Sequence, residues 1–116
     1  MLQVTAQSKI FLAIRPVDFR KGIEGLMAVC QQQLGQNPFL GSLFVFRNRK
    51  GTSLKILVFD GQGFWLCQKT LAEGKLRWWP KSRETTKNLN VSQLQILLWN
   101  GNPMTAQIAP DWKRIE

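Results

Sequence analysis

Lysine and arginine residues are concentrated in the middle of the sequence, where they could bind phosphate groups. Residues 47–87 contain ten bases and three acids, a net charge of +7, whereas the whole chain of 116 residues carries +9. Basic side chains neutralise phosphates and release their counterions, so this cluster favours a nucleic acid as partner. An anionic membrane surface is the weaker alternative.

Much of the usual catalytic chemistry is excluded by composition. The sequence contains no His, which removes the commonest general base and metal ligand. Asp18, Asp60 and Glu84 could form a carboxylate triad for two-metal phosphoryl transfer, but Asp18 is predicted to cap a helix and Asp60 to form a turn. We therefore expect no enzyme activity, no metal and no cofactor. A small basic ribonuclease that stabilises transition-state charge with Arg and Lys stays an alternative.

The start of the sequence predicts neither export nor membrane insertion. Its apolar run, Ile10–Ile14, has five residues, fewer than the roughly seven that the core of a signal peptide requires. We expect a cytoplasmic protein without membrane contact. Because the cytoplasm is reducing, Cys30 and Cys67 are expected to be unpaired, and both are predicted to be buried.

Apolar spacing predicts the elements that must position the cations. Ile10–Ile14 reads as a strand, and apolar residues at helical spacing follow Asp18 as far as Leu34. The period then changes to two. Four strands are predicted at 43–47, 54–59, 64–71 and 75–79, with a second amphipathic helix at 91–99.

This order predicts a single α+β domain over residues 1–116. Connections of about two to seven residues favour antiparallel pairing of successive strands. The predicted fold is a four-stranded antiparallel β-meander packed with two helices, in the order β-α-β-β-β-β-α.

Strand alternation predicts one mixed face that carries both cations and aromatic rings and is open to solvent. Its members are Arg47, Lys55, Lys69, Lys75 and Arg77, interleaved with Trp65 and Trp79. Cations beside flat rings suit phosphates and base stacking, or a protein interface with a cationic rim. The alternative is that the Lys stems only cover apolar side chains while their charged ends stay in water.

Two signature stretches and several further positions of the sequence resemble a known family. Val17–Leu26 (VDFRKGIEGL) is similar to the TDMRKGFDGL signature of a small protein encoded by bacterial transposable elements. Residues 37–51 (NPFLGSLFVFRNRKG) are similar to its second signature. Further matching positions are Leu54–Leu57, Asp60–Phe64, Lys69, Leu71, Gly74, Trp79-Pro80 and Leu94–Leu98. The chain thus resembles the TnpB-type accessory protein, also called second-open-reading-frame-like, of the insertion-sequence-66 transposons. The resemblance covers a family-like core at about residues 10–80 and part of the predicted C-terminal helix, about 91–99.

The resemblance implies a role in DNA transposition beside a separate, larger transposase. It supplies no catalytic residues, but its motifs contain Arg20 and Lys21, and Arg47, Arg49 and Lys50. The predicted function is a non-catalytic accessory protein that binds DNA, at transposon ends or non-specifically, or the transposase–DNA complex. The predicted nucleic-acid-binding residues are Arg20, Lys21, Arg47, Arg49, Lys50, Lys55, Lys69, Lys75, Arg77, Lys81 and Arg83.

Two further possibilities stay open from the sequence. Trp65 and Trp79 are predicted either to stack on bases or to form a protein interface. In the second case the protein would dock on the transposase without touching DNA, and the charge would serve solubility or steering. Homo-oligomerisation is also left open.

Overall fold

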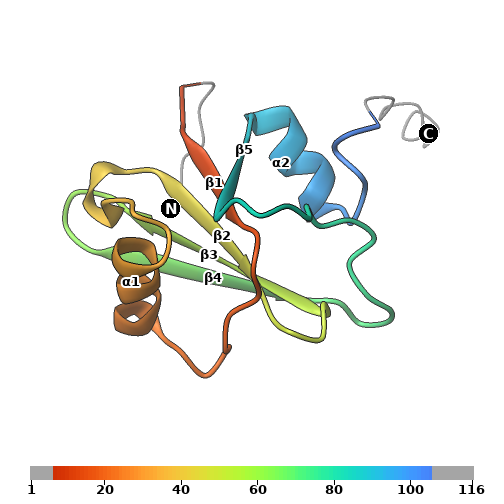
Figure 1. The fold of residues 1–116 in the computed structure, drawn as a ribbon, viewed down its shortest axis with the longest axis horizontal. Helices are drawn as coiled ribbons and strands as arrows, with labels where there is room; N and C mark the ends of the chain where they lie inside the picture. Colours follow the sequence, from red (N-terminus) through yellow and green to blue (C-terminus); the bar gives the residue numbers. More distant parts are fainter. Residues whose placement is uncertain (1–6, 106–116) are drawn as a thin grey trace.

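The computed structural model describes residues 7–105, which form two α-helices, a short 3-10 helix and five strands. The elements are β1 (Ile10–Ala13), α1 (Ile23–Gln32), η1 (Pro38–Leu40), β2 (Leu43–Arg47), β3 (Ser53–Phe59), β4 (Phe64–Thr70), β5 (Thr86–Leu89) and α2 (Val91–Leu98) (Figure 1). The α+β class and the elements as far as β4 agree with the prediction, as does the C-terminal helix.

The sheet is five-stranded and mixed, so the predicted four-stranded antiparallel meander is wrong. Its strand order is β4-β3-β2-β1-β5. β1 and β2 are parallel, with Ile10 opposite Leu43, and the other neighbours are antiparallel. Parallel neighbours need a crossover connection, which α1 provides. β1 therefore lies between β2 and β5, in the interior of the sheet.

The fifth strand is not the segment that the sequence predicted. Residues 75–79 form no strand; they belong to a long connection, 71–85, that leads from β4 to β5 across the sheet. Leu76 and Trp79 pack against the apolar cluster under α2. The Trp79 indole N–H also donates to the carbonyl of Ala13 at 2.9 Å. These contacts hold the segment across the sheet, and Thr86–Leu89 pairs with β1 instead.

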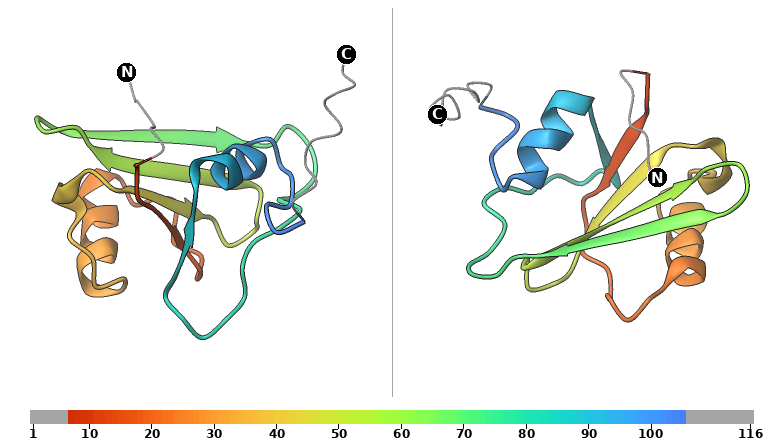
Figure 2. Two further views of the ribbon diagram at one scale, coloured as in Figure 1. Left: turned by 90° about the horizontal axis from the view of Figure 1, so that it is seen from above. Right: turned by 180° about the vertical axis from the view of Figure 1, so that it is seen from behind.

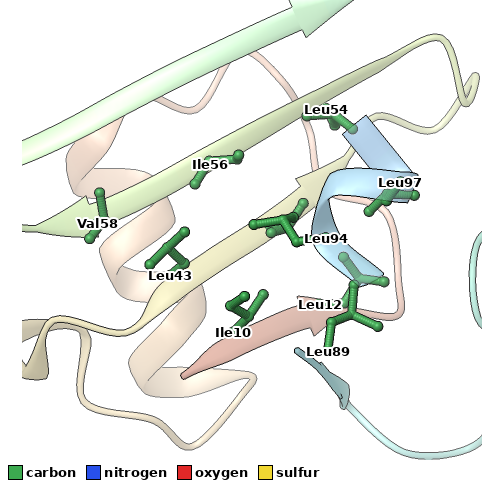
Figure 3. Packing of buried hydrophobic residues seen from close by; sticks show 10 residues of the cluster. Ile10, Leu12, Leu43, Leu54, Ile56, Val58, Leu89, Leu94 and Leu97 are labelled. Carbon is green, nitrogen blue, oxygen red and sulfur yellow. The ribbon is translucent and has the colours of Figure 1, made fainter. Parts of the chain in front are cut away.

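Both faces of the sheet are covered, because the two helices pack on opposite sides. Leu26, Val29 and Cys30 of α1 pack with Phe44 and Phe46. Leu94 and Leu97 of α2 point toward strand residues of the other face (Figure 3). The strand residues of that face are Ile10, Leu12, Leu43, Val45, Leu54, Ile56, Val58 and Leu89. Burying each of these Leu or Phe side chains stabilises the fold by about 1.5–3 kcal/mol. Because helices pack on both faces, the open sheet face predicted from the sequence is absent over most of the sheet.

Two local predictions also fail. Asp18 does not cap α1, whose N-cap is Gly22; the Asp18 carboxylate instead accepts from the backbone N–H of Arg20 at 2.9 Å. Cys30 is buried as predicted, and burial raises the pKa of its thiol to about 12. Cys67 is exposed, because it lies on the edge strand β4, where α2 does not cover it.

Candidate nucleic-acid interface

The loops that carry most of the charge gather at one end of the sheet. β1, β2 and β4 finish at this end, and β3 and β5 begin there. The loops 14–22, 48–52 and 71–85 are therefore neighbours, and backbone hydrogen bonds join them. Ile14 N–H donates to Thr85 O at 3.1 Å, and Leu76 N–H donates to Gly51 O at 2.8 Å. In Figure 1 this end lies at the right and bottom, where the connection after β4 passes the β2–β3 turn.

We call this surface the basic end. It comprises the cations of the three loops and those at the adjoining strand ends: Arg15, Arg20, Lys21, Arg47, Arg49, Lys50, Lys69, Lys75, Arg77, Lys81, Arg83 and Lys87. Its acids are Asp18, Glu73 and Glu84. Most of these cations are exposed; Arg47 and Lys87 are half-buried.

Few of these cations are neutralised by acids in the part of the chain that the structure describes. Among residues 7–105 there is one ion pair, Arg20 Nη2 to Asp18 Oδ2 at 2.7 Å. The Arg20 guanidinium holds the pKa of the Asp18 carboxyl well below its usual range. Cations that lack acidic neighbours create a positive potential in the surrounding water and attract polyanions. The basic end therefore has the electrostatics of a phosphate-binding surface.

Arg47 and Trp79 form a half-buried pair inside this end. The Arg47 guanidinium carbon lies 5.9 Å from the centre of the Trp79 ring, and Arg47 Nε is buried without a hydrogen-bond partner. Burial lowers the pKa of Arg47, and the charge of Arg49 adds to the effect. The Trp79 ring is thus in contact with Arg47 while its N–H bonds to Ala13.

Lys55 does not belong to the surface, which corrects its predicted role. It lies on the α1 side of β3, between Leu54 and Ile56 of the other face, and is 7% exposed. Its ammonium group donates to the carbonyls of Phe19 at 2.9 Å and Lys21 at 3.0 Å. It also lies 4.8 Å from the Phe19 ring centre. Lys55 therefore fixes the loop that displays Arg20 and Lys21. In the sequence, the apolar residues on both sides of Lys55 were the signal that could have indicated its burial.

Trp65 lies away from the basic end. It is 40% exposed at the start of β4, and its indole N–H donates to Asp60 Oδ2 at 2.8 Å. Asp60 also accepts from the backbone N–H groups of Gln62 and Gly63, and these hydrogen bonds lower the pKa of its carboxyl. Trp65 shares a face with Lys69, but four residues of strand separate them by about 13 Å. The predicted interleaving of Trp65 with the cations is therefore not observed.

Lys69 borders a groove that the sequence did not reveal. Its ammonium group donates to the carbonyl of Leu98 and lies 5.9 Å from the ring centre of Trp99, which is 83% exposed. The groove between β4 and the end of α2 has a volume of about 300 Å³ and a mainly apolar lining. Periodicity marked Trp99 only as the end of a helix.

The opposite end of the sheet is apolar at its surface, and we call it the apolar end. It carries η1 and the β3–β4 turn, at the left of Figure 1. Phe39 is 45% exposed and Leu40 is 74% exposed. The Phe39 ring contacts the rings of Phe59 and Phe64, with centroids 5.1 and 5.2 Å apart. The sequence placed these residues in a motif but gave no sign that they would be exposed.

Comparison with known proteins gives the same family as the sequence motifs. Residues 8–107 match the family described as IS66 Orf2 like protein, TnpB_IS66. The chain belongs to this family. The match extends beyond residue 80, so the IS66 Orf2-like family includes the connection after β4, β5 and α2. Membership connects the protein with the transposition machinery of IS66 elements.

Two related proteins from Sinorhizobium fredii (strain NBRC 101917 / NGR234) are similar along most of their length. The uncharacterized protein y4jC is 30% identical over 93% of this chain and 84% of its own. The uncharacterized protein y4hO is 36% identical over 84% of each chain. No solved structure matches. In the part of the chain that the structure describes, no helix is long and apolar enough to span a membrane.

Proposed function

We propose that this IS66 Orf2-like protein binds DNA through its basic end as a non-catalytic accessory factor in transposition. The observation that carries the proposal is the gathering of cations from three separate loops on one end of the sheet, where among residues 7–105 only Arg20 is ion-paired. A flexible loop can reach phosphates without desolvating the core, and the rigid sheet fixes the spacing between loops. Phosphate contacts of this kind position a protein on DNA with little dependence on sequence.

The residues proposed for contact follow from exposure. Those exposed on the three loops are Arg15, Arg20, Lys21, Arg49, Lys50, Lys75, Arg77, Lys81 and Arg83. Lys69 is directed to α2 by its bond to Leu98, and Lys55 is excluded by burial. The proposal therefore replaces the sheet face predicted from the sequence with the loops at its end.

A matched pair of lysines tests the proposal. Lys50→Gln and Lys9→Gln remove the same charge from exposed positions at opposite ends of the sheet. We expect Lys50→Gln to weaken duplex DNA binding about tenfold at 50 mM salt and to reduce the salt slope by about one. Lys9→Gln should change the affinity by less than about twofold. Fluorescence anisotropy on labelled duplex measures both.

Equal losses in the two variants would show that only net charge matters, and would contradict the proposal. We expect the duplex DNA to be recovered intact after the titration, and RNA incubated with the protein to stay intact as well. Cleaved nucleic acid would favour the ribonuclease alternative.

A second candidate function is favoured by the apolar end. Exposed Phe39 and Leu40 are the kind of side chains that form the centre of protein interfaces. We propose that this end, rather than Trp65 and Trp79, contacts the transposase of the same element. Loss of transposase capture in a Phe39→Ser/Leu40→Ser variant would support this role, and unchanged capture would contradict it.

A further inference from the structure

β4 is an unprotected edge of the sheet. It is seven residues long and, among residues 7–105, pairs only with β3. Figure 2 shows it along one side of the sheet, with β5 at the opposite side. Edge strands are usually kept from pairing by short length, proline, bulges or charges. β5 has four residues, whereas β4 has no proline and a single charge, Lys69.

The register determines which backbone groups of β4 face outward. Hydrogen bonds from Asp60 N–H to Gly63 O (3.0 Å) and from Leu71 N–H to Thr52 O (2.9 Å) fix the alternation along the β3–β4 hairpin. By that alternation, Trp65, Cys67 and Lys69 bond to β3. The N–H and C=O groups of Phe64, Leu66, Gln68 and Thr70 then point away from the sheet. Within the described chain no other strand pairs with this edge.

We propose that β4 pairs with β4 of a second copy, in antiparallel register centred on Cys67. This register uses all the outward-facing groups of the strand. It places Phe64 opposite Thr70, Trp65 opposite Lys69 and Leu66 opposite Gln68 of the other copy. Large side chains thus face smaller or flexible ones, and the strand is complementary to itself.

Charge argues for this strand as the place where two copies meet. Two proteins with a net charge of +9 repel each other, so a stable contact requires an edge with few cations. In the proposed register each Lys69 faces a Trp65 ring rather than a second cation, which is favourable. Lys69 already lies over Trp99, so the second copy's Trp65 would extend the aromatic wall of the groove beside α2. The antiparallel pairing also directs the two basic ends in opposite directions.

Cys67 offers a direct test of the register. At the centre of the pairing the two Cys67 residues form a non-hydrogen-bonded pair, with Cα atoms about 4.5 Å apart, within the range of a disulfide. Oxygen from air, with copper phenanthroline as the catalyst, is the oxidant and accepts the two electrons and two protons that the two thiols lose when the S–S bond forms. We expect Cys30→Ser to form a disulfide-linked dimer on a non-reducing gel, and Cys67→Ser to stay unlinked. Cys30 is buried and Cys67 exposed, so the reaction reports Cys67.

A second measurement tests the hydrogen bonds of the edge. Gln68→Pro removes an outward N–H that β3 does not use, whereas Gln68→Ala keeps it. Light scattering of the full chain, without nucleic acid, should show a dimer for wild type and Gln68→Ala. We expect Gln68→Pro to weaken dimerisation about tenfold or more, with circular dichroism confirming its fold.

Three results would overturn the proposal. They are a wild-type monomer at about 100 μM, a dimer that a folded Gln68→Pro variant leaves unchanged, or a Cys30→Ser dimer in which Cys67 does not cross-link. A monomer would leave the β4 edge to a strand from a different protein. None of these readouts depends on DNA binding, so this proposal and the proposed function fail separately.

Discussion

The two ends of the sheet carry opposite kinds of surface. The basic end displays Arg49, Lys50 and the cations of the loops 14–22 and 71–85, and the apolar end displays Phe39 and Leu40. Helices cover most of both faces between these ends, although the side chains of the edge strand β4 are largely exposed. In this small fold the exposed chemistry has therefore moved from the faces of the sheet to its ends, and each end can serve a different partner.

The comparison also separates cations that bind from cations that hold the structure. Lys50 lies in an exposed turn, whereas Lys55, five residues later, is buried and bonded to two carbonyls. Both carry the same charge. Their surroundings, rather than their residue type, decide whether that charge is available to a phosphate.

The largest expected effect is on the stability of the fold, when Lys55 is substituted. Lys55→Met leaves the carbonyls of Phe19 and Lys21 without their donor and should lower the free energy of unfolding by about 2–3 kcal/mol. Lys50→Gln should leave it within about 0.5 kcal/mol of wild type. Urea titration followed by tryptophan fluorescence compares the two. Equal free energies of unfolding for the two variants would contradict the structural role assigned to Lys55.

A smaller, pH-dependent effect is expected at Asp60, the acid of the apolar end. Hydrogen bonds from Gln62, Gly63 and Trp65 lower the pKa of its carboxyl below the ordinary value of 3.8. The stability that it contributes is therefore present above pH 3.8 and is lost as the pH falls through the lowered pKa. Asp60→Asn should reduce the Tm at pH 7, with a smaller difference from wild type at pH 2. A difference that is independent of pH in calorimetry would contradict the assignment.

The smallest effect is expected for DNA binding when the apolar end is changed. Phe39→Ser/Leu40→Ser alters no charge and lies at the end opposite the cationic loops. Its DNA affinity should stay within about twofold of wild type, because the electrostatic contribution to binding depends on the phosphates that are neutralised. A tenfold loss in anisotropy would show that the nucleic acid extends to this end.

Local patterns in the sequence predicted most elements but not how distant ones meet. Strands at 43–47, 54–59 and 64–71, and both helices, follow from periodicity and lie within a few residues of the observed bounds. The pairing of β1 with β2 and with β5 depends on contacts between distant segments, which periodicity does not report. For residues 75–79 the β-rich composition reflects packing of Leu76 and Trp79 on the core, not strand pairing.

The sequence predicted which types of residue form the candidate site but not where in the fold they lie. The charge of residues 47–87 indicated a polyanion, and the exposed cations are indeed mostly on that stretch. Alternation along β3 placed Lys55 outside, because it assumed one solvated face. Once helices cover both faces, a charged residue in mid-strand is buried and needs its own partners, and Lys55 has them.

The salt dependence of DNA binding tests the central claim most directly. If the basic end engages about six phosphates, log affinity for a duplex should fall with log salt at a slope near −5 between about 50 and 200 mM. The same titration with Lys50→Gln should give a slope near −4, and with Lys9→Gln the wild-type slope. A wild-type slope near zero, or no binding at the lowest salt, would contradict the account.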